Sequence, residues 1–227
     1  MYAPSCCGRE GIYIITYDDV YCKTKFRVIL NLLFYSTEMV FVCKIQLNIL
    51  QKYDSIYECM DKFMLEALAE ARKAAAKGEI PVGAVIVKDG EIIGRGHNST
   101  ETDRDTTAHA EMLAIRQASK YLGETLGWRR LTGCDMYVTM EPCAMCAGAI
   151  VWARIETLYI GTMDPKAGGC GSVFNIVQEQ KLNHYVDIVQ IEDGPIKEEC
   201  QEIIRSFFRE LRDRKKLTKE KSEDAKL

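Results

Sequence analysis

Two short strings, residues 109–111 and 142–146, carry the residue types of a catalytic metal site. Together they supply one imidazole, from His109, and two thiols, from Cys143 and Cys146. A catalytic zinc site has three such protein ligands and keeps one position for water. Zinc lowers the pKa of a bound water to roughly 7, so that hydroxide exists at neutral pH. The strings therefore predict hydrolytic zinc chemistry, with the carboxylate of Glu111 in the first string available to move protons.

The cysteine pair lies where a strand is expected to end and a helix to begin. Residues 135–140 predict the strand, and residues 143–153 predict the helix. Pro142 suits the first helical position, because it lacks the N–H that would be unpaired there. Cys143 and Cys146 are three residues apart and share one helix face, and the N-terminus of the helix favours thiolates.

His109 also opens an expected helix, over residues 108–121 with Thr107 as the candidate N-cap. Helix starts at the ends of sheet strands can meet at one point, where open α/β sheets bind ligands. Helical spacing does not place Glu111, because a residue two positions after His109 projects well away from it. Both residues reach one site only if the metal lies off the end of the helix.

Two other uses of a Cys-x-x-C pair remain open on the sequence. A redox pair of the thioredoxin type leaves the string His109-Ala110-Glu111 unexplained. A structural zinc needs a fourth ligand, and Cys134, Cys170 and His184 lack finger-like spacing to the pair. A catalytic zinc explains both strings and is the favoured interpretation.

The other elements predict one mixed sheet with helices on both faces. The dipeptide Asp89-Gly90 is typical of a hairpin turn between two strands. Further helices are expected at residues 63–77 and 195–216, and the strands at residues 82–88, 91–96, 135–140, 157–161 and 186–191.

Composition indicates a globular protein without a membrane span. The 227 residues are 47% hydrophobic and 28% charged, with a net charge of −3. This charge argues against a broad nucleic-acid-binding surface and leaves room for a local basic stripe. The most apolar stretch, residues 26–50, is interrupted by polar residues such as Glu38 and Lys44. No leader pattern is evident, and a cysteine pair beside a histidine favours a reducing compartment, so a cytoplasmic protein is expected.

Residues 1–59 differ from the rest of the chain. They hold seven of the eleven tyrosines and five of the ten cysteines, but only one alanine. We expect an N-terminal extension over residues 1–59, outside a catalytic domain over residues 60–227. Translation of an upstream sequence, with the true start at Met60 or Met64, is the favoured explanation, and a real accessory segment is the alternative.

The ordered pattern H-x-E…P-C-x-x-C is a known signature of zinc-dependent nucleobase deaminases. The chain resembles the cytidine-deaminase superfamily and, within it, the bacterial tRNA adenosine deaminases, which convert the wobble adenosine of an anticodon to inosine. The resemblance covers about residues 60–216 and implies an α/β fold, a three-layer α-β-α sandwich with a mixed five-stranded sheet. Five strings carry it, at residues 81–85, 107–111, 137–149, 164–172 and 207–209.

The resemblance also implies roles for single residues. His109, Cys143 and Cys146 become the ligands of one Zn²⁺ per subunit, and Glu111 becomes the proton shuttle. Asn98 matches the base-contacting asparagine of the family. The family forms homodimers, and its substrate is the anticodon stem-loop of tRNA.

Two further segments are candidates for RNA contact. The glycine-rich residues 161–172 are either a flexible loop or a substrate-facing loop in which Asp164 and Lys166 contact the RNA. The basic residues 205–221 are either a solvated helix face or an RNA contact that includes Arg209. Phe207 and its neighbour Phe208 cannot both face the core of one helix, so one of them is free to meet a base.

The expected function is hydrolytic deamination of the wobble adenosine, with Glu111 passing a proton from the activated water to the flipped-out adenine. The alternative is a zinc-dependent deaminase of a free base or nucleoside, such as guanine, cytosine or cytidine. The basic C-terminal helix favours RNA, and the acidic net charge favours the small molecule. A non-enzymatic zinc-binding module is the third possibility, and it leaves the carboxylate unused.

Overall fold

The computed structural model describes residues 60–127 and 130–224 of the chain. These residues fall within one compact unit, Ser55–Leu227. The expected extension at residues 1–59 lies outside the described residues, so the domain boundary stays a prediction. Among the described helices, none combines the length and the apolar character that crossing a membrane requires.

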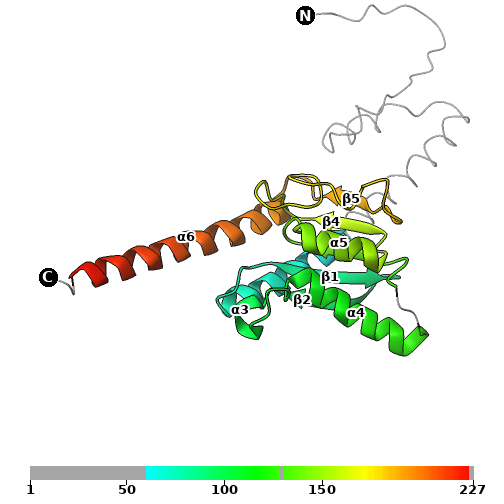
Figure 1. The fold of residues 1–227 in the computed structure, drawn as a ribbon, viewed down its shortest axis with the longest axis horizontal. Helices are drawn as coiled ribbons and strands as arrows, with labels where there is room; N and C mark the ends of the chain where they lie inside the picture. Colours follow the sequence, from blue (N-terminus) through cyan, green and yellow to red (C-terminus); the bar gives the residue numbers. More distant parts are fainter. Residues whose placement is uncertain (1–59, 128–129, 225–227) are drawn as a thin grey trace, which may run out of the picture. The chain divides into compact units, whose positions relative to one another are not determined.

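Five strands form one mixed sheet in the order β2-β1-β3-β4-β5 (Figure 1). Strand β1 (Gly83–Lys88) pairs antiparallel with β2 (Glu91–His97) and with β3 (Asp135–Val138). Strand β4 (Thr157–Ile160) pairs parallel with β3 and with β5 (Asp187–Gln190). All five predicted strands are therefore confirmed, and β1 alone runs against the other four.

The predicted hairpin turn joins β1 to β2. Asp89 and Gly90 both have positive φ, of 50° and 80°. Positive φ at both central residues is the pattern of a type I′ turn, whose twist matches that of the flanking strands. The pairing register shifts between Ile86 and Val87, where β2 contains one extra residue.

Helices cover both faces of the sheet, which confirms the three-layer arrangement. Helices α4 (Ala110–Leu126) and α5 (Ala144–Ala153) share one core with the sheet, and lie over the same face (Figure 1). The helix at residues 60–76 and the start of α6 (Pro195–Asp224) share the second core. The short helix α3 (Thr100–Asp103) follows β2.

Strand β1 shows how one sheet serves two cores. Ala84 and Ile86 belong to the core under α4 and α5, whereas Val85 and Val87 belong to the other core. Successive side chains of a strand point to opposite faces, so this alternation follows from the pleat. All four side chains are buried, as expected for a strand covered on both faces.

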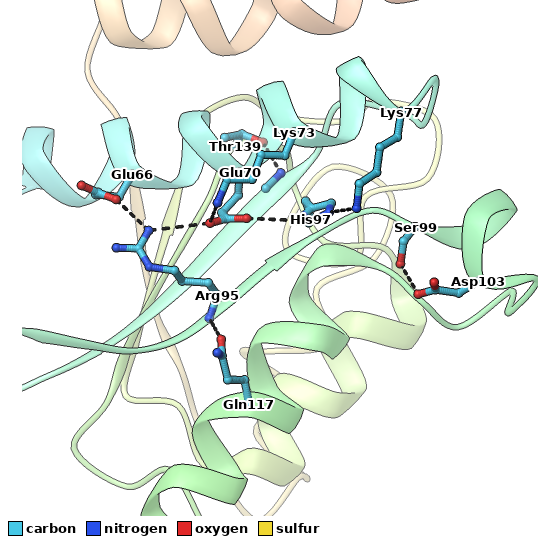
Figure 2. A network of polar contacts seen from close by, with 11 residues as sticks. Glu66, Glu70, Lys73, Lys77, Arg95, His97, Ser99, Asp103, Gln117 and Thr139 are labelled. Atoms are coloured by element: carbon cyan, nitrogen blue, oxygen red, sulfur yellow. Dashed lines mark hydrogen bonds and ion pairs between the residues drawn. The ribbon is translucent and has the colours of Figure 1, made fainter.

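Charged side chains join the helix at residues 60–76 to β2 (Figure 2). The carboxylate of Glu70 is only 3% exposed and contacts Lys73 Nζ at 2.7 Å and His97 Nδ1 at 3.0 Å. Arg95 Nη1 lies 2.7 Å from a carboxylate oxygen of Glu66. Burial acts to raise the pKa of Glu70, but the bonds from Lys73 and His97 outweigh it and hold the pKa below its usual value.

Helix α4 rests directly on the backbone of β2. A Cβ added at Gly96 would collide with the carbonyl oxygen of Ala110 and lie 2.7 Å from the amide nitrogen of Ala114. A Cβ at Gly94 would lie 2.5 Å from the carbonyl oxygen of Ala114. Because glycine on the strand faces alanine on the helix, the two elements approach more closely than larger side chains allow.

We expect Gly96→Ala to lower the free energy of unfolding by about 1–3 kcal/mol, the usual cost of inserting a group into a packed core. Urea denaturation measures the change. Gly194→Ala is the control, because no atom lies within 4 Å of a Cβ at that position. Its effect should stay below about 1 kcal/mol, as for a change of helix cap. Equal effects of the two variants would contradict the close contact of α4 with β2.

Candidate active site

Strand direction brings the candidate site residues to one edge of the sheet. Strands β2, β3 and β4 all run in the same direction, opposite to β1, so their carboxyl ends lie at the same edge of the sheet. Asn98 follows β2, Cys143 follows β3 and Asp164 follows β4. Ligands of open α/β sheets bind at such an edge.

His109 is the N-cap of α4, with an extended backbone (φ −73°, ψ 153°). The prediction that Thr107 caps this helix is therefore wrong. The amide and hydroxyl groups of Thr107 donate to Asp105 Oδ1 at 2.8 and 2.7 Å, which holds Thr107 in the preceding turn. The helix begins two residues later than expected, and His109 lies at its N-terminal end.

Cys143 is the N-cap of α5, also with an extended backbone (φ −69°, ψ 172°). Pro142 precedes the cap, so its predicted place at the first helical position is wrong. The reason is a contact with a distant loop. The Pro142 carbonyl accepts a hydrogen bond from the Gly169 amide at 2.7 Å, and Cys143 forms an isolated β-bridge with Gly168. These contacts keep the chain extended through Cys143.

The three predicted ligands lie together. His109 Nδ1 is 3.7 Å from Cys143 Sγ and 3.6 Å from Cys146 Sγ, and the three ligand atoms all lie within 4.8 Å of one another. Bonds of about 2.0 Å to nitrogen and 2.3 Å to sulfur separate the two ligands of a tetrahedral zinc by about 3.5 Å. The donor set fits zinc in both chemistry and spacing.

The protons of this cluster are shared unevenly. Hydrogen bonds from Cys146 and His109 lower the pKa of Cys143 to about 3, so its sulfur is a thiolate. The bond to Cys143, together with burial, raises the pKa of Cys146. The bond to Cys143 likewise raises the pKa of His109. The three groups thus share their protons through close contacts, and a divalent cation would take the place of those protons.

Glu111 lies in the first turn of α4 and is 3% exposed. Burial raises the pKa of its carboxyl group above the usual value, against the opposing influence of His109 and of a hydrogen bond with Cys146. The structure thus places Glu111 beside the cysteine and histidine ligands, which helical spacing alone did not. A carboxyl group in this position can accept a proton from a water molecule at the donors and release it again.

Asn98 is 6% exposed, and its amide group is hydrogen-bonded to the buried carboxylate of Glu79. Its Nδ2 atom donates to Glu79 Oε2 at 3.2 Å and to Thr100 Oγ1 at 3.3 Å. Glu79 also accepts bonds from the Thr102 amide and hydroxyl groups at 2.7 and 2.8 Å. Burial acts to raise the pKa of Glu79, but the bonds from Thr102 outweigh it and lower the pKa.

Asp164 and Lys166 lie in a loop over residues 162–172 that packs against the start of α5. The Asp164 amide donates to Glu141 Oε2 at 2.8 Å, and Asp164 Oδ1 accepts a bond from the Lys166 amide at 2.9 Å. Glu141 is 4% exposed. Neither Glu141 nor Glu79 carries a predicted role, although each is a charged residue within or directly before a run of mostly apolar residues.

A groove of about 840 Å³ separates this loop from α6. Four cationic side chains line it, from Lys166 on the loop and from Lys197, Arg205 and Arg212 on α6. Phe208 is 37% exposed and lines the same groove. The other lining residues are Met140, Thr162, Met163, Asp164, Pro165, Gln201 and Ile204.

Phe207 and Arg209 lie outside the lining of this groove. Arg209 Nη2 instead lies 3.3 Å from Glu202 Oε1 along α6. The Phe207 and Phe208 rings meet edge to face, with centroids 5.5 Å apart. Of the two aromatic residues, Phe208 is therefore the one that faces the groove.

Comparison with known proteins agrees with this site. A model of the cytidine and deoxycytidylate deaminase zinc-binding region matches residues 57–162. The tRNA-specific adenosine deaminase of Bacillus subtilis (strain 168) is 50% identical over 154 residues, which are 68% of this chain and 91% of that protein. The tRNA-specific adenosine deaminase of Aquifex aeolicus (strain VF5) is 50% identical over 150 residues, 66% of this chain and 94% of that protein.

A solved structure from a study of A-to-I editing by tRNA:A34 deaminases has a TM-score of 0.56 and 45% identity to this chain. The match covers 63% of this chain and 98% of that structure. The relatives are thus matched over almost their whole length, with the zinc donors inside the matched region. The chain therefore belongs to the zinc-binding cytidine and deoxycytidylate deaminase family, in the branch of the tRNA-specific adenosine deaminases.

Proposed function

We propose that this chain hydrolyses the wobble adenosine of a tRNA anticodon to inosine and ammonia. The observation that carries the proposal is the cluster of His109, Cys143 and Cys146, with the buried carboxyl group of Glu111 beside it. The names of the relatives support adenosine in tRNA as the substrate. The thiolates of the cluster need a reducing environment, which favours the cytoplasm.

The three donors would hold the zinc ion, which when bound supplies Lewis acidity and makes a water molecule easier to deprotonate. Glu111 accepts a proton from the attacking water and returns it to a ring nitrogen of the adenine as the bond from oxygen to C6 forms. It then moves the second proton of that oxygen to the amino group, so that the C6–N bond breaks, ammonia leaves and the C6 carbonyl of inosine remains. Asn98 contacts the base and orients it, while Glu79 holds the Asn98 amide group in place.

The groove between the 162–172 loop and α6 favours RNA over a free base. Lys166, Arg205 and Arg212 present positive charge that phosphate groups can bind. The exposed ring of Phe208 offers a stacking surface for an unpaired base of the anticodon loop. A free base or nucleoside carries no backbone that would use this groove, so that alternative leaves it without a role.

We also infer a homodimer. Trp152 is 73% exposed and Met145 is 38% exposed, and the two residues are seven positions apart on α5. Residues at this spacing lie on one face of a helix. Large exposed apolar side chains on one face are typical of a surface covered by a partner, and a second copy of the chain is the partner that the family relationship supports.

Activity on RNA and on small molecules separates the two candidate functions. We expect inosine to form in an anticodon stem-loop that contains the wobble adenosine, measured by nuclease digestion and chromatography. Ammonia release from guanine, cytosine and cytidine should stay at background under the same conditions. The reverse result would establish the small-molecule deaminase instead.

Ligand and shuttle roles predict different losses. Glu111→Gln should keep one zinc ion per subunit but lower turnover about 100- to 10,000-fold, because a general acid–base contributes about that much. Cys146→Ser should lose most of the zinc together with the activity, because it removes a thiolate ligand. Metal analysis of the purified variants and stem-loop turnover test this, and loss of zinc from Glu111→Gln would contradict the division of roles.

The groove predicts a change in salt dependence. Arg205→Ala should weaken stem-loop binding and make the slope of log K against log salt shallower by about 0.7–0.9, the contribution of one phosphate contact. Lys120→Ala is the matched control, because Lys120 is 76% exposed on α4 and is no part of the groove lining. Equal slopes for Arg205→Ala and the unmodified protein would remove the groove from the RNA contact.

The dimer predicts a change in mass. Trp152→Glu should shift the protein from dimer towards monomer in multi-angle light scattering, because a charge would enter an apolar interface. Leu65→Glu is the control, since Leu65 is 45% exposed on the opposite layer of the sandwich. A Trp152→Glu protein with the same mass as the unmodified protein would exclude this face of α5 from the interface.

A further inference from the structure

The buried carboxylate of Glu141 receives all its described hydrogen bonds from one loop. The amide groups of Asp164, Cys170 and Ser172 donate to it at 2.8, 3.0 and 3.0 Å. The Ser172 hydroxyl donates a fourth bond. Both carboxylate oxygens are used, and the donors come from both ends of the 164–172 segment, so one side chain closes this segment into a fixed curve.

The loop backbone lies against the carboxylate without a gap. A Cβ added at Gly168 would overlap both oxygens of Glu141, so a larger residue there would push the carboxylate out of its present position. A Cβ added at Gly169 would lie 2.9 Å from the Ala144 amide nitrogen at the start of α5. The two glycines let the loop wrap around the carboxylate and against α5 at once.

The backbone of Glu141 is itself fixed. Its amide group donates to the Thr162 carbonyl at 2.8 Å, and the Pro142 carbonyl that follows accepts the bond from Gly169 at 2.7 Å. Glu141 stands two residues before Cys143, in the segment that leads from β3 into α5. The carboxylate thus ties the loop to the same segment that carries the first cysteine.

The four donors are neutral N–H and O–H groups, and they balance the charge of a carboxylate that is 4% exposed. An amide in place of the carboxylate would point an N–H group at some of these donors. Buried donors that lose their acceptor are costly, and the loop is free to relieve that cost by moving away.

We propose that Glu141 is a positioning residue that holds Asp164 and Lys166 in the arrangement that meets the RNA. The inference rests on the proposed function for the RNA contact, and the anchoring of the loop stands on the hydrogen bonds alone. Glu141 acts through the loop and touches neither the base nor the metal donors in this proposal. Its loss should therefore weaken substrate binding while zinc binding persists.

The test uses the full chain with zinc bound and the variants Glu141→Gln and Ser172→Ala. We expect faster amide hydrogen exchange at Asp164, Cys170 and Ser172 in Glu141→Gln, together with a stem-loop KM raised at least fivefold. The kcat value and the zinc content should stay within about twofold of the unmodified protein. Ser172→Ala removes one of the four bonds, so it should change exchange and KM in the same direction but less than Glu141→Gln does. If Glu141→Gln folds poorly, Ser172→Ala alone tests the proposal.

Glu70→Gln is the matched control, because Glu70 is a buried carboxylate in the separate network of Figure 2. It should lower the melting temperature and leave loop exchange and KM unchanged. The positioning role is overturned if Glu141→Gln and Ser172→Ala alter only the melting temperature, as Glu70→Gln does. It is also overturned if loop exchange in both variants equals that of the unmodified protein.

Lys166→Ala, alone and combined with Glu141→Gln, separates this inference from the proposed function. If Glu141 acts through the loop, Lys166→Ala should raise KM less in the Glu141→Gln background than in the unmodified protein. Full additivity of the two changes would overturn the positioning role. An unchanged KM for Lys166→Ala alone, with exchange still faster in Glu141→Gln, would count against the proposed RNA contact and leave the anchoring of the loop intact.

Discussion

The shared direction of β2, β3 and β4 is the constraint on which the site depends. Because these strands leave the sheet at one edge, segments distant in the chain start there side by side. His109 and Cys143 are then the N-caps of two helices, and the partial positive charge of each helix N-terminus lies beside the donors. The two helix N-termini therefore stabilise negative charge on the donor atoms even without a bound metal.

Two buried carboxylates that are not metal donors fix segments next to the donor cluster. Glu79 holds Asn98 after β2, and Glu141 holds the loop after β4. In both cases neutral backbone and hydroxyl donors surround the charge, so no lysine or arginine is needed inside the protein. Glu111 differs, because the effect of burial outweighs that of its hydrogen bonds and raises its pKa.

Local signals in the sequence predicted the strands and the turn at Asp89-Gly90, because each depends on neighbouring residues, whereas the zinc donors were predicted from the residue types and order of two distant strings. The two expected helix starts were displaced by different contacts. Asp105, only two positions earlier, holds Thr107 in the preceding turn, whereas the Gly169 amide donates to the Pro142 carbonyl from 27 positions away, which neighbouring residues do not reveal. The bonds of Glu141 to Ser172 span 31 positions, which is why its part in the loop escaped the sequence analysis. The place of Glu111 likewise required the three-dimensional meeting of two helix ends.

The contact of α4 with β2 has a consequence for how the protein can vary. Successive helix residues are rotated by about 100°, so a slip of α4 by one position would swing His109 out of the cluster. The backbone of Gly96 against Ala110 and Ala114 blocks such a slip by shape alone. Apolar residues elsewhere in the core can therefore be exchanged for others of similar size at small cost, whereas a side chain at Gly96 would shift the helix end that carries the imidazole of His109.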